Sequence, residues 1–491
     1  SPYRAVRQFL NGIEATNELY VKAGSTLEGT NKSIWMQDPS AKANKGTLVV
    51  EGGANLMTSA YLDVTEGSTE WPVSVSIAAS ALKGESTVVY ENVPLGYKVD
   101  KINGIWIVTF NPVAKIGDKG YGTLSAAVAA VKDGETITLV ANEVFTENNY
   151  YDNGGWKDGL GYSGDKSFTI DLNDKTICQN GALNDYLIWI KNDGSKANTI
   201  TLKNGTLDAG TTAFCALATA SSNAQKITVN LENIKLINNN SNGATLKIRG
   251  GAELNANAGT IITGKNSYVG IEAVGSKTVV NIYEGAEIYQ NGKSSSWGCL
   301  AGASGNSTIN VYGGEGTSAK GGFIAMTSGG TIKNVTITGV FRGIMIMDPS
   351  QDIYIDNVVI GDDDVCYAIN TAEGNGLHDL YVSNSTLKGW SSFGTAINSV
   401  SFTNCTFAQG TYYTDVFGRI VKPYVNTVFK NCEFNSLFYI DLSALVDGAT
   451  VTLENCTVNG VDYTPANFTE YGDIFSRNNV KVTINGTECQ L

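Results

Sequence analysis

One short pattern returns along the chain and limits what it can fold into. An apolar residue, a variable residue, Asn, two variable residues and another apolar residue follow in order, as in "VSFTNCTF" at residues 400–407. The central Asn of successive copies is Asn204, Asn233, Asn334, Asn357, Asn384, Asn404, Asn431 and Asn455. From Asn334 onward the copies lie 20 to 27 residues apart. Repeats of this length are typical of solenoids and propellers.

The residues around each Asn favour a solenoid. Val400 and Phe402 are apolar while Ser401 and Thr403 are polar, which is the period-two pattern of a strand. Asn tolerates the left-handed backbone region, so it marks a sharp bend between two strands. A third apolar stretch follows in several copies, such as "FCALA" at 214–218. Three strands per turn predict an all-β, parallel β-helix with Asn at one corner, because a propeller needs antiparallel blades of about 40 residues.

A second form of the repeat places Gly where the first has Asn. It occurs as "IRGGAEL" from Ile248, "IYEGAEI" from Ile282 and "VEGGANL" from Val50. Gly also adopts the left-handed region, so we expect the same corner in these turns.

The 491 residues exceed the usual size of a single-core domain, and the pattern predicts four segments. Residues 1–17 are predicted as a capping or attachment helix, and 18–112 as a β-rich block that ends in the hairpin "GYKVDKINGIWIVTF". Residues 113–134 form a junction with a second capping helix, which begins at Thr123 and stops at Gly134. Residues 135–491 form the main β-helix.

The net charge and the distribution of apolar residues limit the classes of partner that we expect. The net charge of −13 disfavours nucleic acid, because an acidic surface repels phosphates. No run of about 20 apolar residues is present, so we expect no membrane insertion. Of the eight Cys residues, Cys405, Cys432 and Cys456 share one repeat position and should face inward. We expect mostly reduced thiols, because strand ladders rarely align two sulfurs for a disulfide.

The segment "AKIGDKGYGTLSAAVAAVKDGETITLV" at 114–140 resembles a junction found in large secreted or surface proteins of gut bacteria. The turns that follow resemble the pectin-lyase-like superfamily of right-handed parallel β-helices, which includes polysaccharide lyases and hydrolases, phage tailspikes and adhesins. The resemblance implies a right-handed β-helix that is extracellular, on a cell surface or in a virion. It does not choose among these functions, since one fold serves many.

The loops after the second strand of each turn should stack on one flank of the solenoid. They carry aromatic, amide and charged side chains, which suit the flat faces and hydroxyls of sugar rings. The candidate binding residues are Trp297, Arg342, Trp390, Tyr412, Tyr413, Asp415 and Tyr463. We therefore expect a non-enzymatic adhesin, glycan-binding protein or structural stalk, with glycans or a host or bacterial cell surface as partner.

Two alternatives remain open. "IGDDDVCYAIN" resembles a polygalacturonase segment, in which Asp362 and Asp363 would act as acid and base, with His378 the only histidine available. The other sequence motifs of that family are missing, which makes an enzyme the weaker hypothesis. Asp362, Asp363 and Asp364 are also the metal candidates; we expect no cofactor, with Ca²⁺ as the alternative. A phage tailspike or fibre is the second alternative, and it would be a homotrimer.

Overall fold

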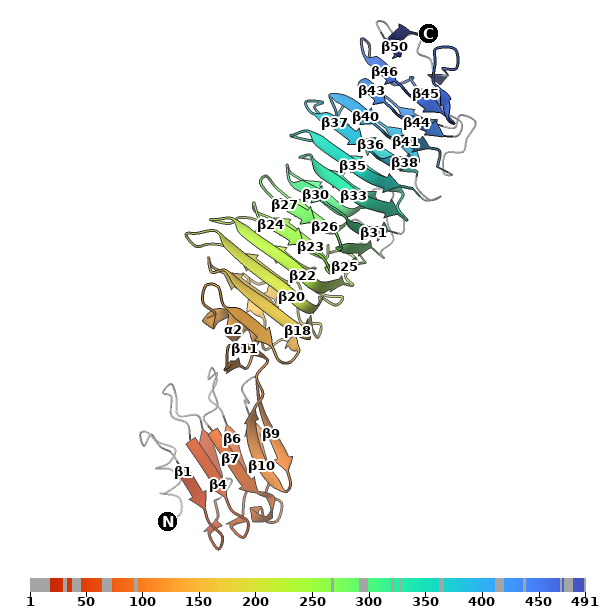
Figure 1. Cartoon of the computed structure of the whole chain (residues 1–491). Helices are drawn as coiled ribbons and strands as arrows, with labels where there is room; N and C mark the ends of the chain where they lie inside the picture. The colour runs from red at the N-terminus through yellow and green to blue at the C-terminus, as the bar shows by residue number, and fades with distance from the viewer. Residues whose placement is uncertain are drawn as a thin grey trace. The chain divides into compact units, whose positions relative to one another are not determined.

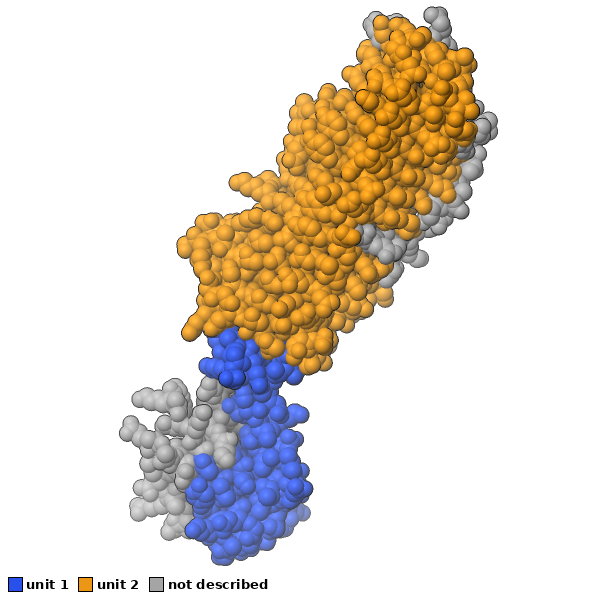
Figure 2. Space-filling view, viewed as in Figure 1, with its two compact units in different colours: residues 1–130, 139–141 blue, residues 131–138, 142–491 orange. Residues whose placement is uncertain are grey.

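The computed structural model describes residues 18–29, 33–37, 46–63, 73–91, 96–265, 269–290, 299–318, 322–326, 328–361, 366–410, 419–435, 439–468, 470–471 and 480–489. The predicted helix at 1–17 lies outside these residues. The chain divides into two compact units (Figure 2), residues 1–130 with 139–141, and residues 131–138 with 142–491.

The second unit is a parallel β-helix, and the described residues form a β-solenoid of about 14 turns. Strands of the first column, which precede the Asn corner, pair in parallel from turn to turn (Figure 1). They are β13 (Thr136–Leu139), β18 (Phe168–Gln179), β20 (Asn198–Asp208), β22 (Ile227–Asn238), β24 (Glu253–Ala256), β27 (Val279–Ile282), β30 (Thr308–Val311), β33 (Gly330–Thr338), β35 (Ile353–Ile360), β37 (Asp379–Ser383), β40 (Ser399–Thr403), β43 (Asn426–Lys430), β46 (Thr450–Glu454) and β50 (Lys481–Ile484).

The second column follows the corner. The long strands β18, β20, β22, β33 and β35 run through the bend and contribute to both columns. The other members are β14 (Glu143–Phe145), β25 (Ile261–Gly264), β28 (Glu287–Gln290), β31 (Gly314–Ser318), β38 (Thr386–Lys388), β41 (Thr406–Ala408), β44 (Glu433–Asn435) and β47 (Thr457–Val458).

The third column forms a separate parallel sheet. Its strands are β17 (Leu160–Ser163), β19 (Tyr186–Lys191), β21 (Cys215–Thr219), β23 (Leu246–Arg249), β26 (Val269–Val274), β29 (Cys299–Ser304), β32 (Gly322–Met326), β34 (Arg342–Ile346), β36 (Tyr367–Thr371), β39 (Trp390–Ser392), β42 (Arg419–Lys422), β45 (Tyr439–Asp441) and β49 (Glu470–Tyr471). Three columns per turn confirm the predicted parallel β-helix.

The Asn corner is present as predicted. Every Asn of the repeat has a positive φ, between 47° and 58°. Side-chain amides join neighbouring turns: Nδ2 of Asn404 donates to Oδ1 of Asn384 at 3.0 Å, and Nδ2 of Asn431 donates to Oδ1 of Asn404 at 3.2 Å. Asn384 itself donates to Asp356 at 2.7 Å rather than to Asn357, so one carboxylate interrupts the ladder.

The Gly form of the repeat needs a correction. In "IYEGAEI", Gly285 has φ 82° and occupies the bend between β27 and β28. In "IRGGAEL", however, Gly250 and Gly251 lie between β23 and β24, which is the corner from the third column to the first. The bend of that turn equivalent to the Asn corner contains Gly259, with φ 76°. Two corners of one turn can use Gly, so Gly alone does not identify the corner.

The core lies inside the three columns. Phe402 and Phe429 stack with ring centroids 5.2 Å apart, and Phe407 and Phe434 stack at 5.1 Å. All four rings are fully buried. Cys405, Cys432 and Cys456 are also buried, and these three are free thiols, as expected.

The first unit has the same arrangement of parallel strands, over fewer turns. Three parallel sets of strands surround an apolar core. They are β1 (Glu18–Val21) with β4 (Gly46–Val50) and β7 (Val73–Ala78), β2 (Thr26–Leu27) with β5 (Asn55–Leu56), and β3 (Ile34–Gln37) with β6 (Ala60–Asp63) and β8 (Val88–Glu91). The predicted hairpin is confirmed as β9 (Tyr97–Ile102) and β10 (Ile105–Phe110), with positive φ at Asn103 and Gly104 as a primed turn requires. β10 also pairs antiparallel with β7.

This unit also contains the short 3₁₀ turn η1 (Ala79–Ala81), the hairpin of β11 (Ala114–Ile116) and β12 (Lys119–Tyr121), and the helix α2 (Leu124–Ala130). The predicted cap of α2 is confirmed, because the Ala126 N–H donates to Oγ1 of Thr123 at 3.0 Å. Three antiparallel pairs complete the second unit: β15 (Tyr151–Asp152) with β16 (Lys157–Asp158), β48 (Val461–Asp462) with β47, and β51 (Thr487–Glu488) with β50.

Candidate functional site

Most of the candidate residues from the sequence fall outside the described part of the chain. Trp297, Asp362, Asp363, Asp364, Tyr412, Tyr413 and Asp415 belong to this group. Arg342, Trp390, Tyr463 and His378 are described.

Arg342 and Trp390 lie in strands of the third column, not in loops. The Arg342 guanidinium lies 4.3 Å from the ring centroid of Tyr367, and that ring stacks on Trp390 at 5.3 Å. Lys422 then lies 5.9 Å from the Trp390 ring. The four side chains therefore form one row across successive turns. Arg342 and Trp390 are each only 9% exposed, so little of either is open to a ligand.

Tyr463 and His378 also differ from the loop flank expected of them. Tyr463 is fully buried, and its ring lies 5.9 Å from Phe434, so it belongs to the core. His378 is partly exposed, with Nδ1 3.7 Å from Oδ1 of Asp352. Asp352 also accepts a hydrogen bond from the Asp379 N–H at 3.0 Å. Nothing around His378 in the described residues forms a nucleophile–base pair.

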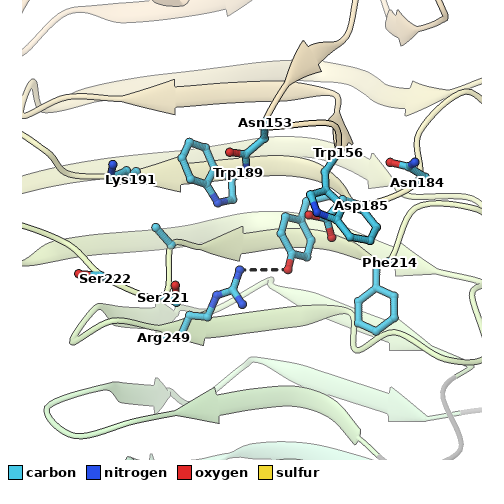
Figure 3. A pocket seen from close by; sticks show the side chains of 12 residues that line it. Asn153, Trp156, Asn184, Asp185, Trp189, Lys191, Phe214, Ser221, Ser222 and Arg249 are labelled. Atoms are coloured by element: carbon cyan, nitrogen blue, oxygen red, sulfur yellow. Dashed lines mark hydrogen bonds between the residues drawn. The ribbon is translucent and has the colours of Figure 1, made fainter.

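A groove of about 760 Å³ opens on the outer face of the third column in its first turns. Its lining residues come from the turn between β15 and β16, from β19 and β23, and from the loops beside these strands: Asn153, Trp156, Asn184, Asp185, Tyr186, Trp189, Lys191, Phe214, Ala220, Ser221, Ser222 and Arg249. In Figure 3, Trp156, Asp185 and Phe214 lie on one side of the hydrogen bond drawn from Arg249, and Trp189 and Lys191 lie on the other.

The floor of the groove is a small apolar cluster outside the main core. Tyr186 and Trp189 of β19 pack with Cys215 and Ala218 of β21, and the ring of Phe214 packs against them. Strand β19 is buried at five consecutive positions, Tyr186 to Ile190, so its outer face is covered as well as its inner one. A solvated outer face would alternate, so this run marks a place where other segments fold over the solenoid.

Arg249 fixes the polar part of the floor. Its Nε donates to the Thr219 carbonyl at 2.7 Å, and its Nη2 donates to the Tyr186 hydroxyl at 3.0 Å. Burial is the main cause that raises the pKa of Tyr186 to about 12, so the phenol stays protonated beside Arg249. Burial also raises the pKa of Asp185, against the opposing effects of Tyr186 and the Arg249 charge.

The β15–β16 hairpin holds the exposed wall. Trp156 sits in its turn and is 57% exposed, while Tyr151 stacks on Trp189 at 5.8 Å. The buried Asp158 fastens the hairpin, since its carboxylate accepts bonds from the Tyr186 N–H at 2.9 Å and from Nδ2 of Asn153 at 3.1 Å. Burial is the main cause that raises the pKa of Asp158 to about 7, and the nearby charge of Asp185 adds to it.

Sequence reasoning missed this groove although a signal was present. The segment "YYDNGGWKDG" at 150–159 places a tryptophan in a Gly-rich turn, and "DYLIWIK" at 185–191 is an unbroken apolar run that carries Tyr and Trp. Both occur before the first good copy of the Asn pattern, at Asn204, and so lay outside the region where the repeat drew attention.

The described residues contain no group of three or more His, Cys, Asp or Glu side chains that could hold a metal ion. Within the same residues, no helix has the length and apolar character needed to cross a membrane. Comparisons of the chain with protein-family models, curated proteins and solved structures found no match.

Proposed function

We propose that this protein is a non-enzymatic, surface-exposed or secreted β-helix protein that binds glycans in the groove formed by Trp156, Tyr186, Trp189, Phe214 and Arg249. The observation that carries the proposal is a groove of about 760 Å³ with aromatic rings on its wall and floor and fixed polar groups between them. Binding sites of this kind combine apolar contact with a few polar groups that orient the ligand.

The exposed ring of Trp156 is the main support. The Trp156 side chain is 57% exposed at the edge of the groove, and its flat apolar face suits the C–H face of a sugar ring. Asn153, Asn184 and Asp185 offer amide and carboxylate groups to hydroxyls within the same groove. The β15–β16 hairpin, fastened through Asp158, holds Trp156 in place before a ligand arrives, which reduces the entropy lost on binding.

The carboxyl groups near the groove favour binding over hydrolysis. A glycosidase needs two carboxyl groups that flank the scissile bond. Asp185 lines the groove, but Asp158 is fully buried beneath it, and both of its oxygens accept bonds from the protein. The carboxyl groups of Asp158 and Asp185 therefore cannot both contact a ligand in the groove. We also propose that the solenoid belongs to the pectin-lyase-like superfamily, which the three columns per turn support.

A glycan array with the wild-type protein and two variants tests the function. Trp156→Ala should lower apparent affinity several-fold to about tenfold, since one stacked ring contributes on the order of 1 kcal/mol. Tyr354→Ala is the matched control, because Tyr354 is 50% exposed on β35, away from the groove. Both variants should unfold at the wild-type temperature. A wild-type protein that binds no glycan, or equal losses in the two variants, would overturn the proposal.

A further inference from the structure

A second hollow of about 550 Å³ adjoins the groove on the same side of the solenoid. The two hollows share Ser221, Ser222 and Arg249. The second hollow continues past β23 to β26 and the turn that follows it, where its lining includes Lys247, Glu272 and Lys277. Together they extend over β19, β21, β23 and β26, four neighbouring strands of the third column. At about 4.8 Å per strand this row spans roughly 14 Å, which accommodates a short oligosaccharide.

The lining of the second hollow is basic in an acidic protein. Across both hollows the charged lining residues are Lys191, Lys247, Arg249 and Lys277 against Asp185 and Glu272, whereas the whole chain has a net charge of −13. A local excess of positive charge on such a surface attracts an anionic group and concentrates it there.

The contacts of Lys247, Arg249 and Lys277 show which of these positive charges are already paired with a carboxylate. Nζ of Lys247 lies 3.0 Å from Oε2 of Glu272, so this pair is balanced. Arg249 is held by the Thr219 carbonyl and the Tyr186 hydroxyl, which are both neutral. Its guanidinium is therefore oriented by two neutral acceptors, while its charge also acts on Asp185 in the same groove. Lys277 is exposed at the turn after β26 and lines the same hollow.

We infer that the ligand of the groove is an acidic glycan, with a sugar ring against Trp156 and an anionic substituent at Arg249 and Lys277. This inference rests on the proposed function and adds the chemical class of the ligand. An oriented guanidinium recognises carboxylate, sulfate and phosphate esters through paired N–H donors, and Lys277 adds a flexible point charge. The chain of the glycan runs across the strands, from the aromatic end of the groove to the basic end.

Calorimetric titration with three tetrasaccharides of matched length tests the inference: a neutral glucan, a polyuronate and a sulfated glucan. The acidic ligands should bind at least tenfold more tightly than the neutral one, and this advantage should shrink as salt rises. The carboxylate and sulfate arms then show which anion the site prefers. Lys277→Gln should weaken the acidic ligands about three- to tenfold and leave the neutral ligand unchanged. Arg249→Gln should weaken the acidic ligands more than the neutral one, because Arg249 also lines the groove that holds the sugar rings.

Lys235→Gln is the matched control, since it removes the same charge from an exposed site on the second column. It should leave every affinity at the wild-type value. The inference is overturned if the neutral and acidic ligands bind equally, or if Lys277→Gln changes the affinities no more than Lys235→Gln does. In that case the proposed function still holds, provided that Trp156→Ala weakens glycan binding. If no tetrasaccharide binds and Trp156→Ala changes nothing on the array, both the proposed function and the inference are overturned.

Discussion

The Asn corner makes a quantitative prediction at Asn404. Its φ of 55° is in the left-handed region, and its side chain accepts one amide bond and donates another. Asn404→Ala keeps the backbone bend but puts a Cβ without a local hydrogen bond into that region, at a cost of about 1–2 kcal/mol. The two lost amide bonds are exposed, so together they add roughly 1 kcal/mol. The expected total is about 2–3 kcal/mol.

Asn404→Gly separates these two contributions. Gly loses the same amide bonds but adopts the left-handed region without strain, at an entropic cost of about 0.5–1 kcal/mol relative to Ala. The expected loss is therefore roughly 1–2 kcal/mol, which is smaller than for Ala.

Native-state hydrogen exchange is the appropriate assay, because a long solenoid opens turn by turn and a single unfolding free energy is poorly defined for it. Amides of β37, β40 and β43 report the opening of the turns on either side of Asn404. Opening free energies there should fall in the order wild type, Gly variant, Ala variant. A Gly variant that loses as much as the Ala variant would refute the claim that Asn is chosen for its backbone conformation.

Three further predictions follow from the core and from titration. Phe407→Ala should lower the opening free energy of the surrounding strands, measured by hydrogen exchange, by about 3–5 kcal/mol, because the buried ring contacts Phe402, Phe429 and Phe434. Replacement of the partly exposed Thr403 by Ala should cost under about 1 kcal/mol, and equal losses would contradict the inward assignment of Phe407. Because the pKa of Asp158 is raised to about 7 in the folded protein, its contribution to stability is full below pH 4 and is lost as pH rises to about 7. The stability of Asp158→Asn relative to wild type should thus rise between pH 5 and pH 8, on the order of 1–4 kcal/mol in the opening free energy of the β19 amides measured by hydrogen exchange, and a difference that does not change with pH would count against the buried carboxyl. Under native conditions a thiol reagent followed by mass spectrometry should modify the partly exposed Cys178 and spare the buried Cys405, Cys432 and Cys456 until the protein is denatured; early modification of those three would show that the solenoid opens there.

The elements that the sequence predicted well depend on local chemistry. The Asn corner needs only a residue that tolerates positive φ between two alternating strands, and the β9–β10 turn needs only Asn-Gly between two strands. The cap of α2 likewise depends on one Thr hydroxyl three residues from its donor. Each of these preferences acts over a few residues, so a single sequence is enough to reveal it.

The elements that were missed or misplaced depend on contacts between distant residues. Trp390 and Tyr463 were expected on exposed loops because they follow the second strand, but the third column and the core take up their rings. A second amide ladder, in which Asn255, Asn281 and Asn310 each donate to the preceding Asn at 2.8–2.9 Å, was also missed. These Asn residues face outward within strands, so their spacing has no meaning until the register between turns is known.

The location of the groove follows from the nature of a repeat. Identical turns stacked in register give a straight face with no hollow, because each strand covers its neighbour in the same way. A concave site therefore needs a segment that breaks the repeat, and the β15–β16 hairpin does so by covering the outer face of β19. The same break explains the buried Asp158, whose carboxylate would face water on a regular turn but here fastens the hairpin that presents Trp156. The regular turns fix the spacing of the floor, and the irregular segment supplies the wall, so binding residues in such a chain are better sought where the repeat fails than where it is clearest.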